Sequence, residues 1–122
     1  MTKDYVAICQ EFEAGAKNFG GQAPEVVGAF RQLVTAASKP GALDGKTKEL
    51  MALAISITLR CEGCIAFHTK AAIKAGATGA EVADAIGVAM EMGGGPAFVF
   101  GTAAHEAYEQ FMQAEFSSEK VG

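Results

Sequence analysis

The sequence of 122 residues lacks several features that define whole classes of protein. It has no tryptophan and no run of about 20 apolar residues, the length that a membrane-spanning helix needs. Its lysines and arginines do not cluster, and phosphate backbones are bound mainly by clustered cations, so no nucleic-acid partner is expected. Residues 1–19 carry three acidic side chains and no continuous apolar segment, unlike a secretory signal. We therefore expect a cytoplasmic protein without a membrane partner.

The composition that remains favours one all-α domain. Half of the residues are hydrophobic and a fifth are charged, as in globular proteins, and the formal net charge is −4. Alanine is the most frequent apolar residue, and alternating β-branched runs are few, so helices are favoured over sheets. The length fits a single domain over residues 1–122. We predict an oligomeric bundle of about six helices.

Apolar residues recur at three- and four-residue intervals in six segments. The expected helices are 4–18, ended by Gly20 and Gly21; 24–37; 46–58, after an Asp44 N-cap; 62–75, before Gly76; 79–92, opened by a capping box of Thr78 and Glu81; and 96–116. We expect the first two to pack as a pair. The third is apolar nearly all round, so part of it is expected to contact another subunit. Residues 117–122 are expected to form a short polar tail.

Two of the three cysteines lie three positions apart, in Cys61-Glu62-Gly63-Cys64. At a helix start both sulfurs share one face and lie close enough to form a disulfide. The helix N-terminus favours thiolate over thiol, which lowers the pKa of a cysteine there and makes its sulfur nucleophilic. Thiol–disulfide exchange also needs a second, resolving thiol, which the pair supplies. The pattern therefore predicts reversible redox chemistry.

His68 and Glu49 are predicted to handle protons beside this pair. His68 follows Cys64 by four residues, one turn further along the same helical face. The midpoint between Glu49 and His68 falls within the expected turn at residues 58–60, so the two can face each other in an antiparallel helix pair. We predict Glu49 as the outer base, His68 as the relay and the sulfurs of Cys61 and Cys64 as the reaction centre.

Other interpretations of these four residues stay open. They could be zinc ligands, although three of them share barely two helical turns, which makes tetrahedral geometry awkward. The cysteines could also be packing residues. We predict no metal and no cofactor.

The remaining reactive residue types are predicted to lie outside the site. His105 is expected at the surface or an interface, and Cys9 is expected to be a buried, inert thiol. Arg60 adjoins Cys61. Its charge either stabilises the thiolate of Cys61, or its side chain lies in an exposed turn and has no role in the chemistry.

The spacing of Glu49, Cys61, Cys64 and His68 resembles the signature of the AhpD-like (alkylhydroperoxidase D) branch of the carboxymuconolactone decarboxylase superfamily. The stretch AAIKAGATGAEVADAIGVAMEMGGGPAF is also similar to that family, and the resemblance covers about residues 24–112. Some relatives carry a second histidine where this chain has Gly63.

The resemblance implies an all-helical homo-trimer or homo-hexamer with peroxidase or disulfide reductase activity. Cys64 would attack the peroxide and Cys61 would resolve the product. The substrate would be a small hydroperoxide or disulfide, and the electron donor a dithiol or thiol protein. The alternative is the decarboxylase branch, which acts on a small lactone acid without this dithiol.

Overall fold

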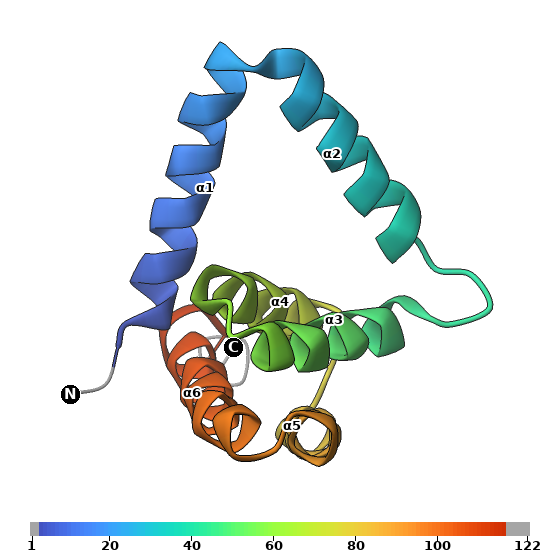
Figure 1. Ribbon diagram of the computed structural model, residues 1–122, viewed down its shortest axis with the longest axis vertical. Coiled ribbons are helices and arrows are strands. Elements are labelled where there is room, and N and C mark those ends of the chain that lie inside the picture. Colours follow the sequence, from blue (N-terminus) through green and yellow to red (C-terminus); the bar gives the residue numbers. More distant parts are fainter. Residues whose placement is uncertain (1–2, 117–122) are drawn as a thin grey trace.

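The computed structural model describes residues 3–116 as six α-helices and one π-helical turn (Figure 1). In chain order these are α1 (Tyr5–Gln22), α2 (Pro24–Ser38), α3 (Gly45–Leu59), α4 (Glu62–Lys74), α5 (Gly79–Gly93), α6 (Gly95–Phe111) and η1 (Met112–Phe116). The described part contains no β-strand, so the all-α prediction is confirmed. None of its helices is both long enough and apolar enough to cross a membrane.

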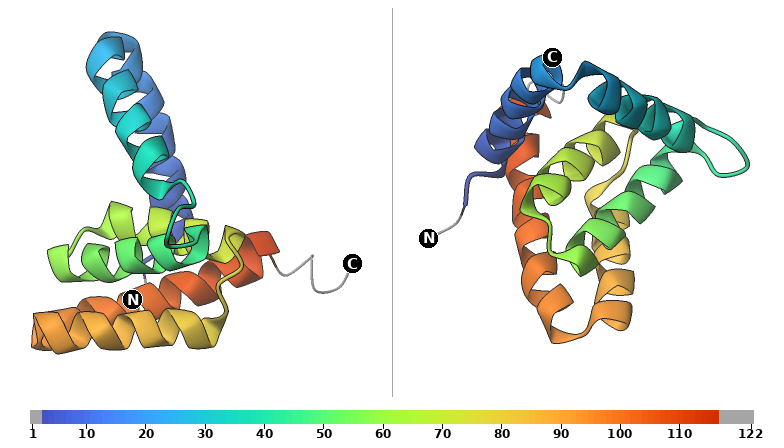
Figure 2. Two further views of the ribbon diagram at one scale, coloured as in Figure 1. Left: turned by 90° about the vertical axis from the view of Figure 1, so that its right-hand side faces the viewer. Right: turned by 45° about the horizontal axis from the view of Figure 1, so that its top comes forward.

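Two helix hairpins form the body of the molecule. The hairpin of α3 and α4 lies over the hairpin of α5 and α6, so the body has two layers (Figure 2). Apolar side chains fill the space between the layers, and Tyr5 and Cys9 at the base of α1 extend this core. The largest fully buried side chains are Phe111, Leu53, Ile57, Ile65, Val82, Thr69 and Cys9. Burial of this apolar surface is the main source of stability for the body.

Helices α1 and α2 form an arm that rises from the body. The two helices are joined at a bend and diverge from it (Figure 1). Helix α2 has no buried residue, and its side chains Phe30 and Leu33 are 63% and 61% exposed. The predicted packing of the first two helices as a pair is therefore wrong along most of their length.

The end of α1 also differs from the prediction. The helix continues through Gly20 and Gly21 to Gln22 instead of ending at the glycines, because a glycine weakens a helix without forbidding it. The chain bends at Ala23, which has φ −131° and ψ 65°. Pro24 follows it, and a proline disfavours helical backbone at the preceding residue, so the proline marks the boundary.

The starts of α3 and α5 and the end of α4 follow the predicted caps closely. The Asp44 carboxylate accepts a hydrogen bond from the backbone N–H of Thr47 at 2.8 Å. Thr78 and Glu81 form both bonds of the capping box, at 3.1 and 2.9 Å. Gly76 takes the predicted left-handed conformation after α4, with φ +96°. Each of these caps provides hydrogen-bond partners for backbone N–H or C=O groups that a helix end leaves without one.

The last helix is shorter than predicted. Helix α6 begins at Gly95 and ends at Phe111, and the chain then continues to Phe116 as a π-helical turn. A change of hydrogen-bond pattern leaves no signal in the apolar periodicity, which continues through Met112 and Phe116. The predicted polar tail, 117–122, lies outside the described residues.

Gly101 lets α5 and α6 approach closely. A Cβ atom at this buried position would lie 2.7 Å from Cγ2 of Ile86. Carbon atoms prefer a separation of about 3.5–4.0 Å, so the contact has no room for a methyl group.

We expect Gly101→Ala to lower the free energy of unfolding by about 1–3 kcal/mol, because the methyl group overpacks the contact with Ile86. Gly87→Ala on α5 is the matched control, since no atom other than those of the adjoining helix backbone lies within 4 Å of its Cβ position. There alanine should stabilise the helix by about 0.5–1 kcal/mol. Urea unfolding followed by circular dichroism measures both, and a stabilised Gly101→Ala variant would contradict the close contact.

Candidate active site

The turn between α3 and α4 positions the first cysteine. Helix α3 ends at Leu59, and Arg60 takes the left-handed conformation with φ +58°. The N–H of Arg60 donates to the carbonyl of Ile57, and that of Cys61 donates to the carbonyl of Ser56, both at 3.1 Å. This is the Schellman pattern that closes a helix end. It fixes Cys61 at the point where α4 begins.

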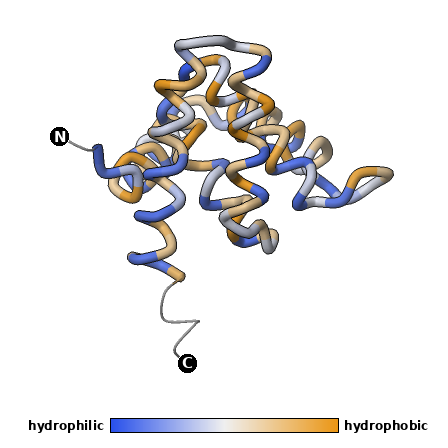
Figure 3. The backbone as a smooth tube through the Cα atoms, turned by 90° about the horizontal axis from the view of Figure 1, so that it is seen from below, coloured by the Kyte–Doolittle hydropathy of each residue, from blue (hydrophilic) through white to orange (hydrophobic). Residues whose placement is uncertain are grey.

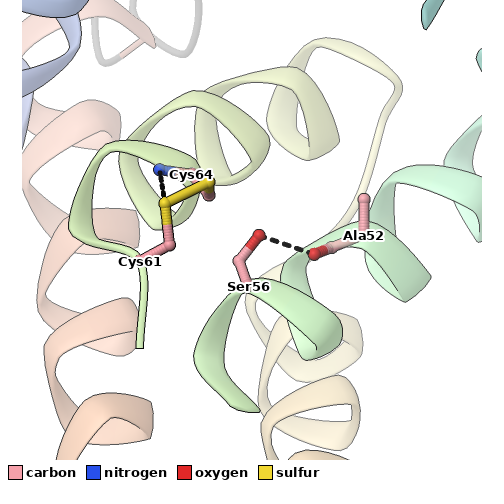
Figure 4. Close-up of a disulfide and its surroundings, with 4 residues drawn as sticks. All are labelled: Ala52, Ser56, Cys61 and Cys64. Carbon is pink, nitrogen blue, oxygen red and sulfur yellow. Dashed lines mark hydrogen bonds between the residues drawn. A yellow bond between two sulfur atoms is a disulfide. The ribbon is translucent and has the colours of Figure 1, made fainter. Parts of the chain in front are cut away.

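Cys61 and Cys64 form a disulfide across the first turn of α4 (Figure 4). Their Cα atoms are 5.2 Å apart, a separation normal for a disulfide. Cys61 is the N-cap residue of α4, and its Sγ accepts a hydrogen bond from the N–H of Cys64 at 3.2 Å. Both residues are partly exposed. The predicted proximity of the two sulfurs is therefore confirmed, and the helix N-terminus directs an N–H donor at the sulfur of Cys61.

Ser56 is a buried polar residue of α3 beside the disulfide (Figure 4). Its hydroxyl donates to the carbonyl of Ala52, one turn earlier, at 2.7 Å. This internal bond satisfies the hydroxyl where the helix is otherwise apolar. The sequence shows Ser56 as a polar residue within an apolar run, but its place beside the disulfide follows only from the α3–α4 packing.

His68 and Glu49 meet across the α3–α4 hairpin. Nδ1 of His68 lies 2.9 Å from Oε1 of Glu49, and the side chains are only 26% and 17% exposed. The predicted pairing is therefore present. An ionised carboxylate can only accept a hydrogen bond, so Nδ1–H of the histidine donates to it. When the ring is neutral, Nε2 is left with a lone pair that can take a proton.

The histidine and the disulfide are neighbours on α4 and have no hydrogen bond to each other within residues 3–116. His68 lies one turn after Cys64 on this helix. The rings of Phe67 and His68 meet edge to face with their centroids 5.1 Å apart, and the ring of Phe12 on α1 meets that of Phe67 with centroids 6.3 Å apart. Phe67 therefore links the arm to the histidine. The arrangement combines an S–S bond with an imidazole one helical turn away.

A contact that the sequence did not predict lies at the first turn of α4. Glu62, between the two cysteines, forms an ion pair with Lys3 from the N-terminal segment. The two residues are 59 positions apart, and no periodicity or motif connects them. Only the packing of the N-terminal segment against the body reveals this pair.

The other candidates lie where they were expected. His105 is exposed and 3.9 Å from Glu109 on its own helix. Cys9 is 1% exposed, and its burial, together with the charge of Glu13, raises the pKa of its thiol. The buried position is confirmed, while the inertness of Cys9 stays a prediction. Arg60 is exposed, and its evident part in the site is the left-handed turn.

The four residues weighed as zinc ligands do not form a coordination sphere. In the part of the chain that the structure describes, no three His, Cys, Asp or Glu side chains are placed to hold a metal ion. Cys61 and Cys64 are bonded to each other in this state, and Glu49 is bonded to His68.

Comparison with known proteins gives consistent results. Residues 24–109 match the sequence profile of the carboxymuconolactone decarboxylase family. A member of this family from Legionella pneumophila, solved in its apo form, superposes with a TM-score of 0.85 at 39% identity, over 88% of this chain and 96% of its own. A family member from Thermotoga maritima, for which involvement in the antioxidative response has been suggested, has a TM-score of 0.80 at 29% identity, over 98% and 99%.

Uncharacterized relatives show a similar extent of likeness. A protein of Cupriavidus necator is 32% identical over 85% of this chain and 92% of its own. A protein of the cox locus of Paracoccus denitrificans is 36% identical over 80% of this chain and 81% of its own.

Proposed function

The chain belongs to the carboxymuconolactone decarboxylase family, and from this premise we propose that it is a thiol-dependent peroxidase or disulfide reductase. The observation that carries the proposal is the Cys61–Cys64 disulfide at the start of α4, one turn from the pair of His68 and Glu49. The suggested antioxidative role of the Thermotoga maritima relative supports the same class of chemistry.

The proposed cycle begins with the reduced pair. The thiolate of Cys64 attacks one peroxide oxygen, the O–O bond breaks, and the other oxygen leaves as an alcohol or water after taking a proton. The thiol of Cys61 then attacks the sulfenic sulfur of Cys64, which forms the disulfide and releases water. The two electrons that reduce the peroxide come from the two thiols. The assignment of Cys64 as the attacking residue follows the family resemblance.

Regeneration of the dithiol uses the N-cap hydrogen bond. A thiol donor attacks the sulfur of Cys64, and Cys61 leaves as a thiolate. The N–H of Cys64, 3.2 Å from the Cys61 sulfur, stabilises the negative charge on that leaving group. A second thiol of the donor then releases Cys64 and carries the disulfide away. We place this exchange in the cytoplasm, where dithiols and thiol proteins are kept reduced.

The Glu49–His68 pair supplies proton transfer in this proposal. Nε2 of His68 takes the proton of the Cys64 thiol and returns it to the departing oxygen. Glu49 fixes the ring through Nδ1 and stabilises the imidazolium while it holds the proton.

We expect one equivalent of hydrogen peroxide to remove two of the three thiols of the reduced protein, as a Cys61–Cys64 disulfide that dithiothreitol reverses. Thiol titration and mass spectrometry measure this. Cys64→Ser should lower thiol-dependent peroxide turnover at least about 100-fold, since the nucleophile is lost. Cys9→Ser is the control and should keep full turnover. Full turnover by Cys64→Ser would refute the proposal, and consumption of a lactone acid by that variant would favour the decarboxylase alternative.

His68→Asn should lower the rate constant of peroxide turnover by about 100-fold, because a positioned acid–base group contributes at least that much. Glu49→Gln should have a smaller effect, and the double variant should be no slower than His68→Asn, since the two residues act as one unit. His105→Asn is the matched control on the other histidine. Additive losses in the double variant would show that Glu49 does not act through His68.

We also propose that copies of this chain assemble into a trimer or hexamer through the arm and α3. Both expose large apolar side chains that a single chain leaves in water, and hydrophobic positions recur along the helices (Figure 3). The exposed set on these helices comprises Phe12, Phe19, Val26, Phe30, Leu33, Met51, Ile55 and Leu59. Apolar patches of this kind mark protein–protein contacts.

Light scattering should therefore give three or six times the 12.6 kDa mass of one chain. Placing charges in the interface, in the double variant Phe30→Glu and Leu33→Glu, should produce smaller species, because unpaired buried charges are costly. Gln32→Glu, at an exposed polar position of the same helix, is the control for added charge and should leave the mass unchanged. A monomeric natural chain would contradict this proposal.

A further inference from the structure

An ion pair joins the N-terminal segment to the first turn of α4, the turn that carries the disulfide. Glu62 is the first residue of α4 and stands between Cys61, the N-cap, and Cys64, one turn in. Its carboxylate pairs with the ammonium group of Lys3. The Glu62 side chain is 36% exposed and that of Lys3 is 59% exposed, so the pair lies at the surface, where a salt bridge contributes little to stability. Glu62 lies between the two cysteines in the sequence, so this pair places its charges on the helical turn that carries both of them.

The lysine reaches Glu62 because its backbone is clamped to the body. The side-chain amide of Gln110, on α6, donates to the carbonyl of Lys3 and accepts from the N–H of Tyr5, both at 2.7 Å. Asp4 caps α1 between them by accepting from the N–H of Ala7 at 3.0 Å. The side chain of Tyr5 is buried in the core. The N-terminal segment is therefore held in place by contacts independent of the ion pair.

The charged and titratable groups around Glu62 come from several elements. Lys3 of the N-terminal segment pairs with Glu62, and Tyr5 of α1 lies within range of the charges of both and of Glu106 on α6. Arg60 precedes Glu62 by two residues in the chain. The hydrogen bond with Glu62 raises the pKa of Lys3. Burial, followed by the charge of Glu62, raises the pKa of Tyr5. Lys3 therefore stays protonated and Tyr5 neutral at neutral pH, which makes Lys3 the cation that opposes Glu62.

We propose that Glu62 and Lys3 are positioning residues that set the redox equilibrium of the dithiol, an inference that rests on the proposed thiol chemistry. A carboxylate on the residue that follows Cys61 disfavours a thiolate there and so favours the oxidised pair. The ammonium of Lys3 opposes that effect and favours the reduced pair. The docked N-terminal segment thereby makes the disulfide easier to reduce.

The test is the equilibrium between the protein and dithiothreitol. In this exchange the protein S–S bond breaks, two electrons and two protons pass to Cys61 and Cys64, and dithiothreitol closes its own disulfide. Glu62→Gln should shift the equilibrium about threefold toward the reduced protein, and Lys3→Met about threefold toward the oxidised protein. Threefold corresponds to about 14 mV for this two-electron couple. Alkylation by iodoacetamide at pH 7 should be about threefold faster in Glu62→Gln and about threefold slower in Lys3→Met, because the thiolate is the reacting form.

Two matched variants control for the change of charge alone. Glu25→Gln removes a carboxylate from the first turn of α2, and Lys17→Met removes an ammonium from α1. Both should leave the equilibrium unchanged. In the Glu62→Gln background, Lys3→Met should have less than half of its effect, since Glu62 holds the lysine ammonium at the first turn of α4.

Two different failures are distinguishable in this experiment. A natural chain whose Cys61–Cys64 pair does not interconvert with dithiothreitol would overturn the proposed function itself. A pair that interconverts normally, with the same equilibrium in Glu62→Gln, Lys3→Met and the two controls, would overturn only the present inference. Shifts in which Glu62→Gln favours the oxidised protein would overturn it equally.

Discussion

The turn between α3 and α4 is the constraint on which the site depends. Arg60 is the only non-glycine residue with positive φ in the described part of the chain, and the left-handed conformation costs such a residue about 1–2 kcal/mol. Two backbone hydrogen bonds, each contributing about 0.5–1.5 kcal/mol, offset this cost. The turn therefore holds without glycine. It ends α3 and within one residue places the sulfur of Cys61 as the cap of α4.

The same short turn explains why the disulfide and the pair of His68 and Glu49 lie close together. A connection this tight keeps α3 and α4 antiparallel and in register, so residues equally far from it meet. Glu49 and His68 meet ten and nine residues from Leu59, and their bond of 2.9 Å is a consequence of that register. A longer loop would leave the cysteine spacing intact and lose the pairing of the carboxylate with the ring. The turn length is thus as much a part of the site as the four side chains.

Local signals made helices α3 to α6 and the geometry of the candidate site predictable. The contacts between distant segments could not be predicted. Capping residues such as Asp44 and Thr78 mark helix starts because their side chains bond the first turn, whatever the rest of the chain does. The cysteine spacing and the helix register act over a few turns. The divergence of the arm depends on what its apolar face contacts, and the Lys3–Glu62 pair depends on how the N-terminal segment docks. Neither property is encoded in a nearby pattern.

The N-terminal segment links the hydrophobic core to the ion pair at the first turn of α4. Tyr5 and Cys9 extend the core between α4 and α6, so docking of the first helix is driven by apolar burial and not by the exposed ion pair. Once this burial has fixed the backbone, Lys3 is brought to Glu62 with little further loss of entropy. A weak surface interaction can then act consistently on neighbouring sulfurs because the core has already determined its geometry. The hydrophobic contacts that stabilise the fold thus also determine the electrostatic surroundings of the dithiol.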